Sequence, residues 1–279
     1  MLATLWQDLR HGCRMLRKNP GFALIAIASI GVGVGANAAM FSLADGLLLR
    51  PLGVPRPGEV LSIVGTSPER GLLPPGLSYP DYVDIRERVR TFASLAAFRN
   101  VLTGFDARPD QPPLRTIGSA VNGGFFEALG IRPATGRFFR PDEDVVPGRD
   151  AVVVLDHRTW RDRFGLDPSI VGRSVRITDT TFTVIGVAPE SFKGLDLDVW
   201  PAFYVPLAML RETQNPASQE LTRRDVRGLD VKGRLGPGVS LAQAQQELAR
   251  IGDELAKEHP DTNRTRGLAV RTELELRMA

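Results

Sequence analysis

The pattern of apolar and polar residues sets apart one uninterrupted apolar stretch near the N-terminus. Residues 21–44 contain no charged side chain, and only Ser29, Asn37 and Ser42 are polar. As an α-helix this stretch would be roughly 36 Å long, which exceeds the roughly 30 Å hydrocarbon core of a bilayer. The pattern therefore predicts one transmembrane helix within residues 21–48, long enough to cross a bilayer with some tilt.

Three other interpretations compete for this stretch. Gly31, Gly33 and Ala36 fit the G-x-G-x-x-A dinucleotide fingerprint, but no strand precedes them and the nearest acids are Asp45 and Glu59. The A-x-A pattern at residues 36–38 fits a cleaved signal peptide, although the apolar run is longer than the usual 7–15 residues. The length also disfavours a buried core helix. Cleavage stays open as an alternative to a permanent anchor.

Small residues recur at helical spacing within the predicted span. Ser29 and Gly33, and likewise Gly31 and Gly35, stand four residues apart. In a membrane this spacing allows another helix to approach closely, so these positions are candidates for transmembrane helix packing. The alternative is that small residues are simply frequent in such helices.

The first 20 residues predict a short amphipathic helix that precedes the span. Its apolar residues recur at spacings of three and four, and Trp6 lies among them. Arg10, Arg14, Arg17 and Lys18 lie off that stripe. Such a helix fits the membrane interface, with Trp6 at headgroup level and the basic side chains as anchors. An ordinary cytoplasmic surface helix is the alternative.

The charge distribution predicts the orientation. The chain has 35 basic and 32 acidic residues, and its first 20 residues hold four basic residues and one acid, so the remainder is neutral by count. Nucleic-acid binding therefore gains no support. Basic residues ahead of the span place the N-terminus in the cytoplasm and residues 50–279 outside. Cys13 is the only cysteine, which excludes internal disulfides and a cysteine metal cluster.

The long part after the span predicts a mixture of strands and helices. A serine that can cap a helix precedes Tyr82, Ile85, Val89 and Phe92, and Ser240 with Gln243 forms a capping box before another helix. Residues 199–207 are apolar but contain two prolines, which predicts an edge or irregular strand. The other predicted elements are strands at 60–64, 116–121, 151–155, 174–178, 182–187 and 228–235, and helices at 125–129 and after Asp156.

No catalytic constellation is found in the sequence. It contains no G-x-x-x-x-G-K-[ST] loop and no H-E-x-x-H motif, and its three histidines, at 11, 157 and 259, are far apart. We therefore expect no enzyme activity, and no catalytic, cofactor-binding or metal-binding residue in this chain. Any ATP would be bound by a separate subunit.

An ordered set of short motifs resembles a known family. The set comprises Leu49-Arg50-Pro51-Leu52, Ser78-Tyr79-Pro80-Asp81-Tyr82, Val121 to Gly130, Gly136-Arg137-Phe138-Phe139, Trp160 to Gly165, Ile170-Val171-Gly172, Phe182 to Val187 and Leu235 to Ala244. In this order, behind a basic amphipathic start and one span, the motifs resemble the MacB/FtsX-like ABC transporter permeases. The resemblance is to the N-terminal half of the duplicated permeases found in acidobacteria, and it covers nearly the whole chain.

The resemblance implies an α+β fold in a bacterial inner-membrane protein. It implies a two-lobed periplasmic domain at 49–279, with a porter-like lobe from about 49–114 and 226–279 and an inserted mixed lobe at about 115–225. It also implies contact with membrane lipid, a separate ABC ATPase subunit, a homodimer or partner permease, and a periplasmic adaptor. The implied work is export or mechanotransmission driven by that ATPase.

The chain departs from the family pattern at its C-terminus. The resemblance implies further spanning helices, and the sequence ends at Ala279 without one. We therefore expect a partial permease component, from a truncated or split gene, or an anchored module that works with another chain. The alternative function is a membrane-anchored periplasmic binding or interaction module that is independent of a transporter.

Overall fold

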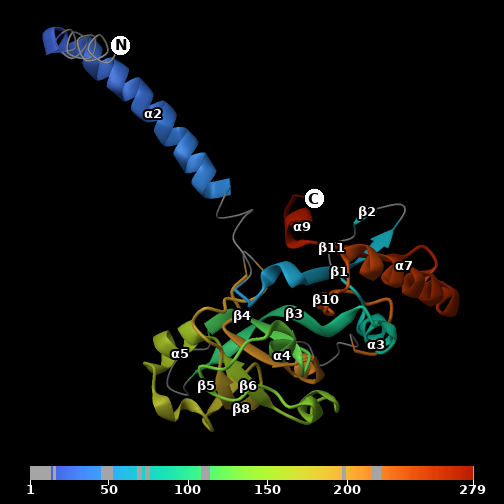
Figure 1. Cartoon of the computed structure of the whole chain (residues 1–279). Helices are drawn as coiled ribbons and strands as arrows, with labels where there is room; N and C mark the ends of the chain where they lie inside the picture. Colours follow the sequence, from blue (N-terminus) through green and yellow to red (C-terminus); the bar gives the residue numbers. More distant parts are fainter. Residues whose placement is uncertain are drawn as a thin grey trace. The chain divides into compact units, whose positions relative to one another are not determined.

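The computed structural model describes residues 14, 17–44, 53–67, 71–72, 76–107, 114–196, 199–214 and 221–278. The chain divides into two compact units, Met1–Arg50 and Pro51–Ala279. The first unit contains the helix α2 (Pro20–Ala44), drawn in blue in Figure 1. The second unit contains the sheet and all the other helices that the structure describes.

Helix α2 matches the predicted transmembrane helix. Its stretch Ala23–Ser42 has a mean hydropathy of 1.9, and it is the one helix of the described residues that is long and apolar enough to cross a membrane. Large apolar side chains such as Leu24 and Phe41 are more than 70% exposed. Such an all-round apolar surface is typical of a helix that faces lipid. Residues 45–48 of the predicted span lie outside the described residues.

The second unit is built on one mixed sheet. In the described residues its order is β11-β1-β10-β3-β4-β9-β6-β8-β5, with β2 beside β1 and with β7 beside β3 and β8. The pairs β4–β9 and β6–β8 are parallel, and the others are antiparallel. The strands are β1 (Val60–Ser67), β2 (Gly71–Leu72), β3 (Phe92–Asp106), β4 (Leu114–Val121), β5 (Thr135–Gly136), β6 (Val152–Leu155), β7 (Ser174–Ile177), β8 (Thr180–Val187), β9 (Phe203–Pro206), β10 (Asp230–Leu235) and β11 (Gly267–Arg271).

The helices of this unit begin where the sequence supplies caps. The α-helices are α3 (Tyr79–Arg88), α4 (Phe125–Leu129), α5 (His157–Phe164), α6 (Leu210–Thr213), α7 (Leu241–Glu258), α8 (Pro260–Asn263) and α9 (Glu273–Met278), and the 3-10 helices are η2 (Pro57–Glu59), η3 (Pro141–Asp144), η4 (Pro168–Ile170) and η5 (Leu207–Met209). Ser78, Asp156 and Ser240 each accept a hydrogen bond from a backbone N–H in the first turn. The predicted mixed α+β class and these three caps are confirmed.

Two clusters of buried side chains lie on opposite faces of the sheet. Leu95 and Ala97 of β3 belong to one cluster, and Ala96 and Phe98 belong to the other. Because side chains alternate along a strand, the two clusters occupy different faces. Helices α3 and α7 contribute to the first cluster, and α4 contributes to the second, which is rich in aromatic rings. Figure 1 shows α7 beside β11 and β1, and α5 near β5 and β6.

A buried carboxylate joins three segments around α3. Asp81 is 2% exposed and accepts hydrogen bonds from Arg224 Nη1 at 2.6 Å, Arg227 Nη1 at 2.8 Å and Asn263 Nδ2 at 2.8 Å. Burial by itself raises the pKa of Asp81, but the bonds from Asn263 and Arg224 and the charge of Arg227 outweigh it, and the net shift is downward. The bonded carboxylate fixes α3 to α8 and to the segment before β10.

Two sequence predictions in this unit were wrong. The helix expected to run through Phe92 ends at Arg88, because Glu247 of α7 accepts hydrogen bonds from the backbone N–H groups of Arg90 and Thr91 and holds the chain extended there. Residues 199–207 were expected to form an edge or irregular strand, and their strand β9 lies not at an edge but between β4 and β6. Its proline stands at the last residue, where few ladder bonds are lost.

The predicted division into two lobes stays a prediction. Strand β3 comes from the segment assigned to the porter-like lobe, and β4 comes from the segment assigned to the insert. These two strands pair along Phe98–Phe105 within the same sheet.

Candidate functional site

Three charged side chains alternate along one face of β10. Asp230, Lys232 and Arg234 stand at every second position. On the opposite face, Val231 belongs to the core and Leu235, which follows Arg234, packs against it. We call Asp230, Lys232 and Arg234 the charged row of β10. Each member binds or faces a different segment, which makes the row the main polar junction of this unit.

Arg234 holds the segment with which the described part of this unit begins. Its guanidinium donates to Pro55 O at 3.1 Å, to Glu59 Oε2 at 3.2 Å, and to Ala128 O and Leu129 O at 3.1 and 3.0 Å. The side chain is 11% exposed. A planar fork with five N–H donors suits such a divergent set of acceptors. Arg234 thereby joins residues 53–59 and the C-terminal end of α4 to β10.

Residues 53–59 are also packed tightly by their own side chains. Val54 is buried in the aromatic cluster. A Cβ atom at Gly53 would lie 2.6 Å from the carbonyl oxygen of Ser191, so only glycine fits there. Arg56 adopts a left-handed backbone conformation before η2 and pairs with Glu59 at 3.1 Å. The segment that follows the apolar helix in sequence is therefore fixed to the sheet at several points.

Lys232 holds the last helix of the described chain. Its ammonium group donates to Ser62 Oγ at 2.9 Å and pairs with Glu273, the first residue of α9. Ser62 Oγ in turn donates to Glu273 Oε1 at 2.9 Å. Lys232 and Ser62 are both buried. This bonded triad fixes α9 onto β1 and β10, so the charged row contacts segments from both ends of the unit.

Asp230 is the member of the row whose charged form is disfavoured by its surroundings. Burial raises the pKa of its carboxyl to about 6, the negative charges of Asp196 and Glu273 add to the rise, and Lys232 and Arg99 oppose it. At neutral pH the carboxylate is therefore held in surroundings that favour the protonated form. The unfavourable placement of this negative charge is consistent with a row that serves to connect segments of the unit and not only to stabilise the fold.

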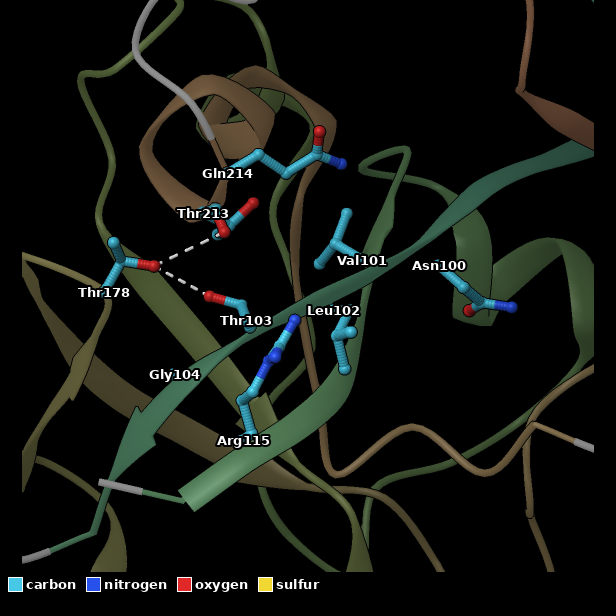
Figure 2. A pocket seen from close by; sticks show the side chains of 9 residues that line it. All are labelled: Asn100, Val101, Leu102, Thr103, Gly104, Arg115, Thr178, Thr213 and Gln214. Carbon is cyan, nitrogen blue, oxygen red and sulfur yellow. Dashed lines mark hydrogen bonds between the residues drawn. The ribbon is translucent and has the colours of Figure 1, made fainter. Parts of the chain in front are cut away.

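An open groove lies beside the middle of β3. It has a volume of about 500 Å³ and is lined by Asn100, Val101, Leu102, Thr103, Gly104, Arg115, Thr178, Thr213 and Gln214. Figure 2 shows these side chains around the strand. Thr178 Oγ1 lies 2.7 Å from Thr103 Oγ1 and donates to Thr213 O at 3.4 Å, which closes one end.

The residues singled out from the sequence lie in the first unit. Trp6 and Arg10 fall outside the described residues, and Arg14, Arg17 and Lys18 are exposed. Ser29, Gly31, Gly33 and Gly35 lie on α2, and a Cβ atom at any of the three glycines would have nothing within 4 Å. The interfacial anchor and the helix-packing face stay predictions, since each needs a partner outside this chain.

The sequence reasoning missed the charged row. The signal was present, because a strand predicted at 228–235 contains Asp230, Lys232 and Arg234 at alternate positions. Alternating charges usually indicate a solvent-facing strand surface, and here they are bonded within the protein. In the described residues no group of three or more His, Cys, Asp or Glu side chains is placed to hold a metal ion.

Comparisons with known proteins identify the family of the chain. The model of the MacB-like periplasmic core domain family matches residues 23–251. The periplasmic region of MacB from Actinobacillus actinomycetemcomitans has a similar fold, with a TM-score of 0.56 and 14% identity over 81% of this chain and 93% of that one. The extracellular domain of the noncanonic ABC-type transporter YknZ from Gram-positive bacteria gives 0.54 and 14% over 75% and 98%. No curated protein sequence matches the chain significantly.

Replacing Arg234 should loosen residues 53–59. We expect Arg234→Ala to lower the free energy of unfolding by about 2–4 kcal/mol, because buried carbonyl groups lose their charged donor. Arg234→Lys should recover only part of the loss, since one ammonium group cannot reach all four acceptors. Hydrogen exchange of residues 53–60, together with urea unfolding of the full chain in detergent, measures both effects.

The exposed Arg250 provides the matched control for this substitution. Among the described residues it pairs only with Glu254, one helical turn away, and its side chain is 57% exposed. Arg250→Ala should change stability by less than about 0.5 kcal/mol. Equal effects of the two alanine variants, or unchanged exchange at residues 53–60 in Arg234→Ala, would contradict the role given to Arg234.

Asp230 should make the fold less stable as the pH rises. Its pKa is about 6 in the folded chain and about 3.9 in an unfolded one, so the folded state holds the extra proton. The stabilisation that this bound proton gives the folded state is present below about pH 4 and is lost as the pH rises through 6. Asp230→Asn should therefore be more stable than the parent by about 1–2 kcal/mol at pH 7.5, with little difference at pH 4.

Urea unfolding at the two pH values tests this expectation. Asp144, whose pKa burial also raises to about 6, should leave some pH dependence in the variant. The exposed Asp253 serves as control, and Asp253→Asn should behave as the parent does. If Asp230→Asn is instead less stable than the parent at pH 7.5, the prediction is wrong, and Lys232 needs the negative charge of Asp230.

Proposed function

We propose, from the premise that this chain belongs to the MacB-like periplasmic core domain family, that it is a permease component of an ABC transporter. In this proposal residues 50–279 are the extracytoplasmic domain, and α2 is its membrane anchor. The domain takes part in export or mechanotransmission that a separate ATPase drives. In this role the domain transmits and receives movement, and its own residues catalyse no reaction.

The charged row of β10 is the observation that carries this proposal. Arg234 fixes the segment that follows the anchor in sequence, and Lys232 fixes α9 at the other end of the domain. Both bonds are made by the same strand, so a displacement of either segment would be transmitted to β10 and from there to its neighbours β1 and β3. Charge-assisted hydrogen bonds are shorter and stronger than neutral ones, which gives this junction a defined geometry.

The proposed partners supply functions for which this sequence contains no motif. It contains no P-loop, so the energy of ATP would enter through a separate ABC ATPase subunit. The small residues that stand four apart on α2, Ser29 with Gly33 and Gly31 with Gly35, support packing against a second helix, from another copy or from a partner permease. A periplasmic adaptor would complete an export pathway.

The proposed location is the bacterial inner membrane. Arg10, Arg14, Arg17 and Lys18 precede α2, and the positive-inside rule then places the N-terminus in the cytoplasm. The apolar surface of α2 and the relatives described above as periplasmic and extracellular regions support the same orientation.

Isolation of the chain with its partners tests the proposed function. The full chain, with an affinity tag at its C-terminus, is crosslinked in bacterial cells and purified from membranes in mild detergent. We expect an ABC ATPase subunit to be recovered with it, together with a second permease chain. The matched control is residues 51–279 exported without α2, which should not recover the ATPase. Recovery of the tagged chain alone from intact membranes would contradict the proposal.

A further inference from the structure

Strand β3 has an interruption in its pairing on one side. Strand β4 pairs with it along Phe98–Phe105. On the other side β10 pairs with it as far as Phe98, and β7 pairs with it only at Phe105 and Asp106. Among the described residues no strand pairs with residues 99–103 on that side. The interruption is roughly 17 Å long, at about 3.4 Å for each residue.

The direction of the backbone groups shows which of them are open. Gly104 O accepts a hydrogen bond from Thr178 N at 2.9 Å, so the peptide groups of Gly104 face the interrupted side. Successive residues of a strand alternate, and the N–H and C=O groups of Asn100 and Leu102 therefore face that side too. No bond to these four groups is found within the described part of the chain.

The groove of Figure 2 lies along this interruption. Its lining includes every residue of β3 from Asn100 to Gly104, with Thr178 and Thr213 at one end. Leu102 is 58% exposed, whereas Val101 and Thr103 are buried and form its floor. Asn100 Oδ1 is buried without a hydrogen-bond partner, while its amide nitrogen donates to Asp196. The site thus offers unpaired backbone groups, one unpaired side-chain acceptor and room for an extended chain.

Arg115 gives the groove its charge preference. It stands directly opposite Gly104 in the β3–β4 pair, and Gly104 presents no side chain to cover it. Figure 2 shows its guanidinium extending over β3 towards Leu102. The side chain is exposed and forms no ion pair with another described residue. A carboxylate on the incoming segment would meet this free cation.

We propose that an extended, acidic peptide segment of a partner protein binds here as an added strand, antiparallel to β3, with its carboxylate on Arg115. The orientation follows from β10 and β7, which flank the interruption and both run antiparallel to β3. The main-chain bonds supply affinity, and the alternate side chains supply specificity. The inference depends on the sheet alone and holds whether or not an ATPase partner is recovered.

A designed peptide tests the site without altering the protein. The probe is fluorescein-labelled Thr-Val-Glu-Val-Thr with blocked ends, in which glutamate is placed opposite Leu102 and the valines opposite Val101 and Thr103. Fluorescence anisotropy with the full chain in detergent should give saturable binding. Replacing the glutamate by lysine should weaken binding by about tenfold or more. N-methylation of the amides that face β3 should abolish binding, and N-methylation of the intervening amides should not.

Substitutions in the protein provide the reciprocal test. Arg115→Ala should weaken binding of the glutamate peptide by about tenfold, and it should leave the binding of a neutral control peptide, with glutamine in place of the glutamate, unchanged. Leu102→Pro removes one N–H that faces the groove and leaves the bonds to β4, which come from the neighbouring residues. It should abolish binding, whereas Leu102→Val, which keeps that N–H, should bind as the parent does. Thermal unfolding confirms that each variant is folded.

Two results would overturn the proposal. The first is the absence of saturable binding by the glutamate peptide up to 1 mM, or binding that is indifferent to the position of N-methylation. The second is concentration-dependent dimerisation of the chain that Leu102→Pro abolishes, because the occupant would then be a second copy of β3 rather than a partner peptide. Sedimentation velocity of the parent and of Leu102→Pro distinguishes this case.

Discussion

The guanidinium of Arg234 makes the contacts on which the arrangement of the second unit depends. It is almost buried and donates to four oxygen atoms from residues 53–59 and α4. A cation in this position is stable only while its acceptors stay in place, and the acceptors need the cation equally. These bonds therefore hold residues 53–59, the aromatic cluster around α4 and strand β10 together. Lys232, two residues earlier, extends this connection to α9.

Strand β3 is the second organising element, because it borders β10, β4 and β7. Its first half pairs with β10 on one side, and on the other side the Asn122 side chain bonds the backbone of Leu95 and Ala97. Its middle has an open edge, where the peptide groups of Asn100 and Leu102 have no partner among the described residues. Proteins usually protect such edges with prolines or inward-pointing charges. Here the edge carries the exposed Leu102, and Arg115 of the neighbouring strand β4 extends towards it without an ion pair to another described residue, which fits the proposed binding of an acidic peptide. The charged row of β10 and the groove beside β3 thus lie at different places along one sheet.

Local signals in the sequence predicted the local structure, and long-range contacts decided the rest. Ser78, Asp156 and Ser240 cap helices as expected, because capping needs only residues within one turn. The unbroken apolar run likewise predicted α2. The long strand β3 was missed, since its start depends on Glu247, which lies 156 residues away from Thr91 and binds its backbone. The bonds from Arg224 and Arg227 to Asp81, and those made by Arg234, also join distant residues, and no periodicity encodes them.

The central claim is that α2 anchors an extracytoplasmic domain with its N-terminus in the cytoplasm. Labelling of intact cells with a membrane-impermeant maleimide measures this directly. Cys13, the only cysteine, should stay unlabelled until the cells are opened. In a Cys13→Ser background, Asp253→Cys on the exposed face of α7 should be labelled at once, on a chain of full-length mass that stays in the membrane. Labelling of Cys13 but not of position 253 in intact cells, or a shortened soluble chain, would contradict the account.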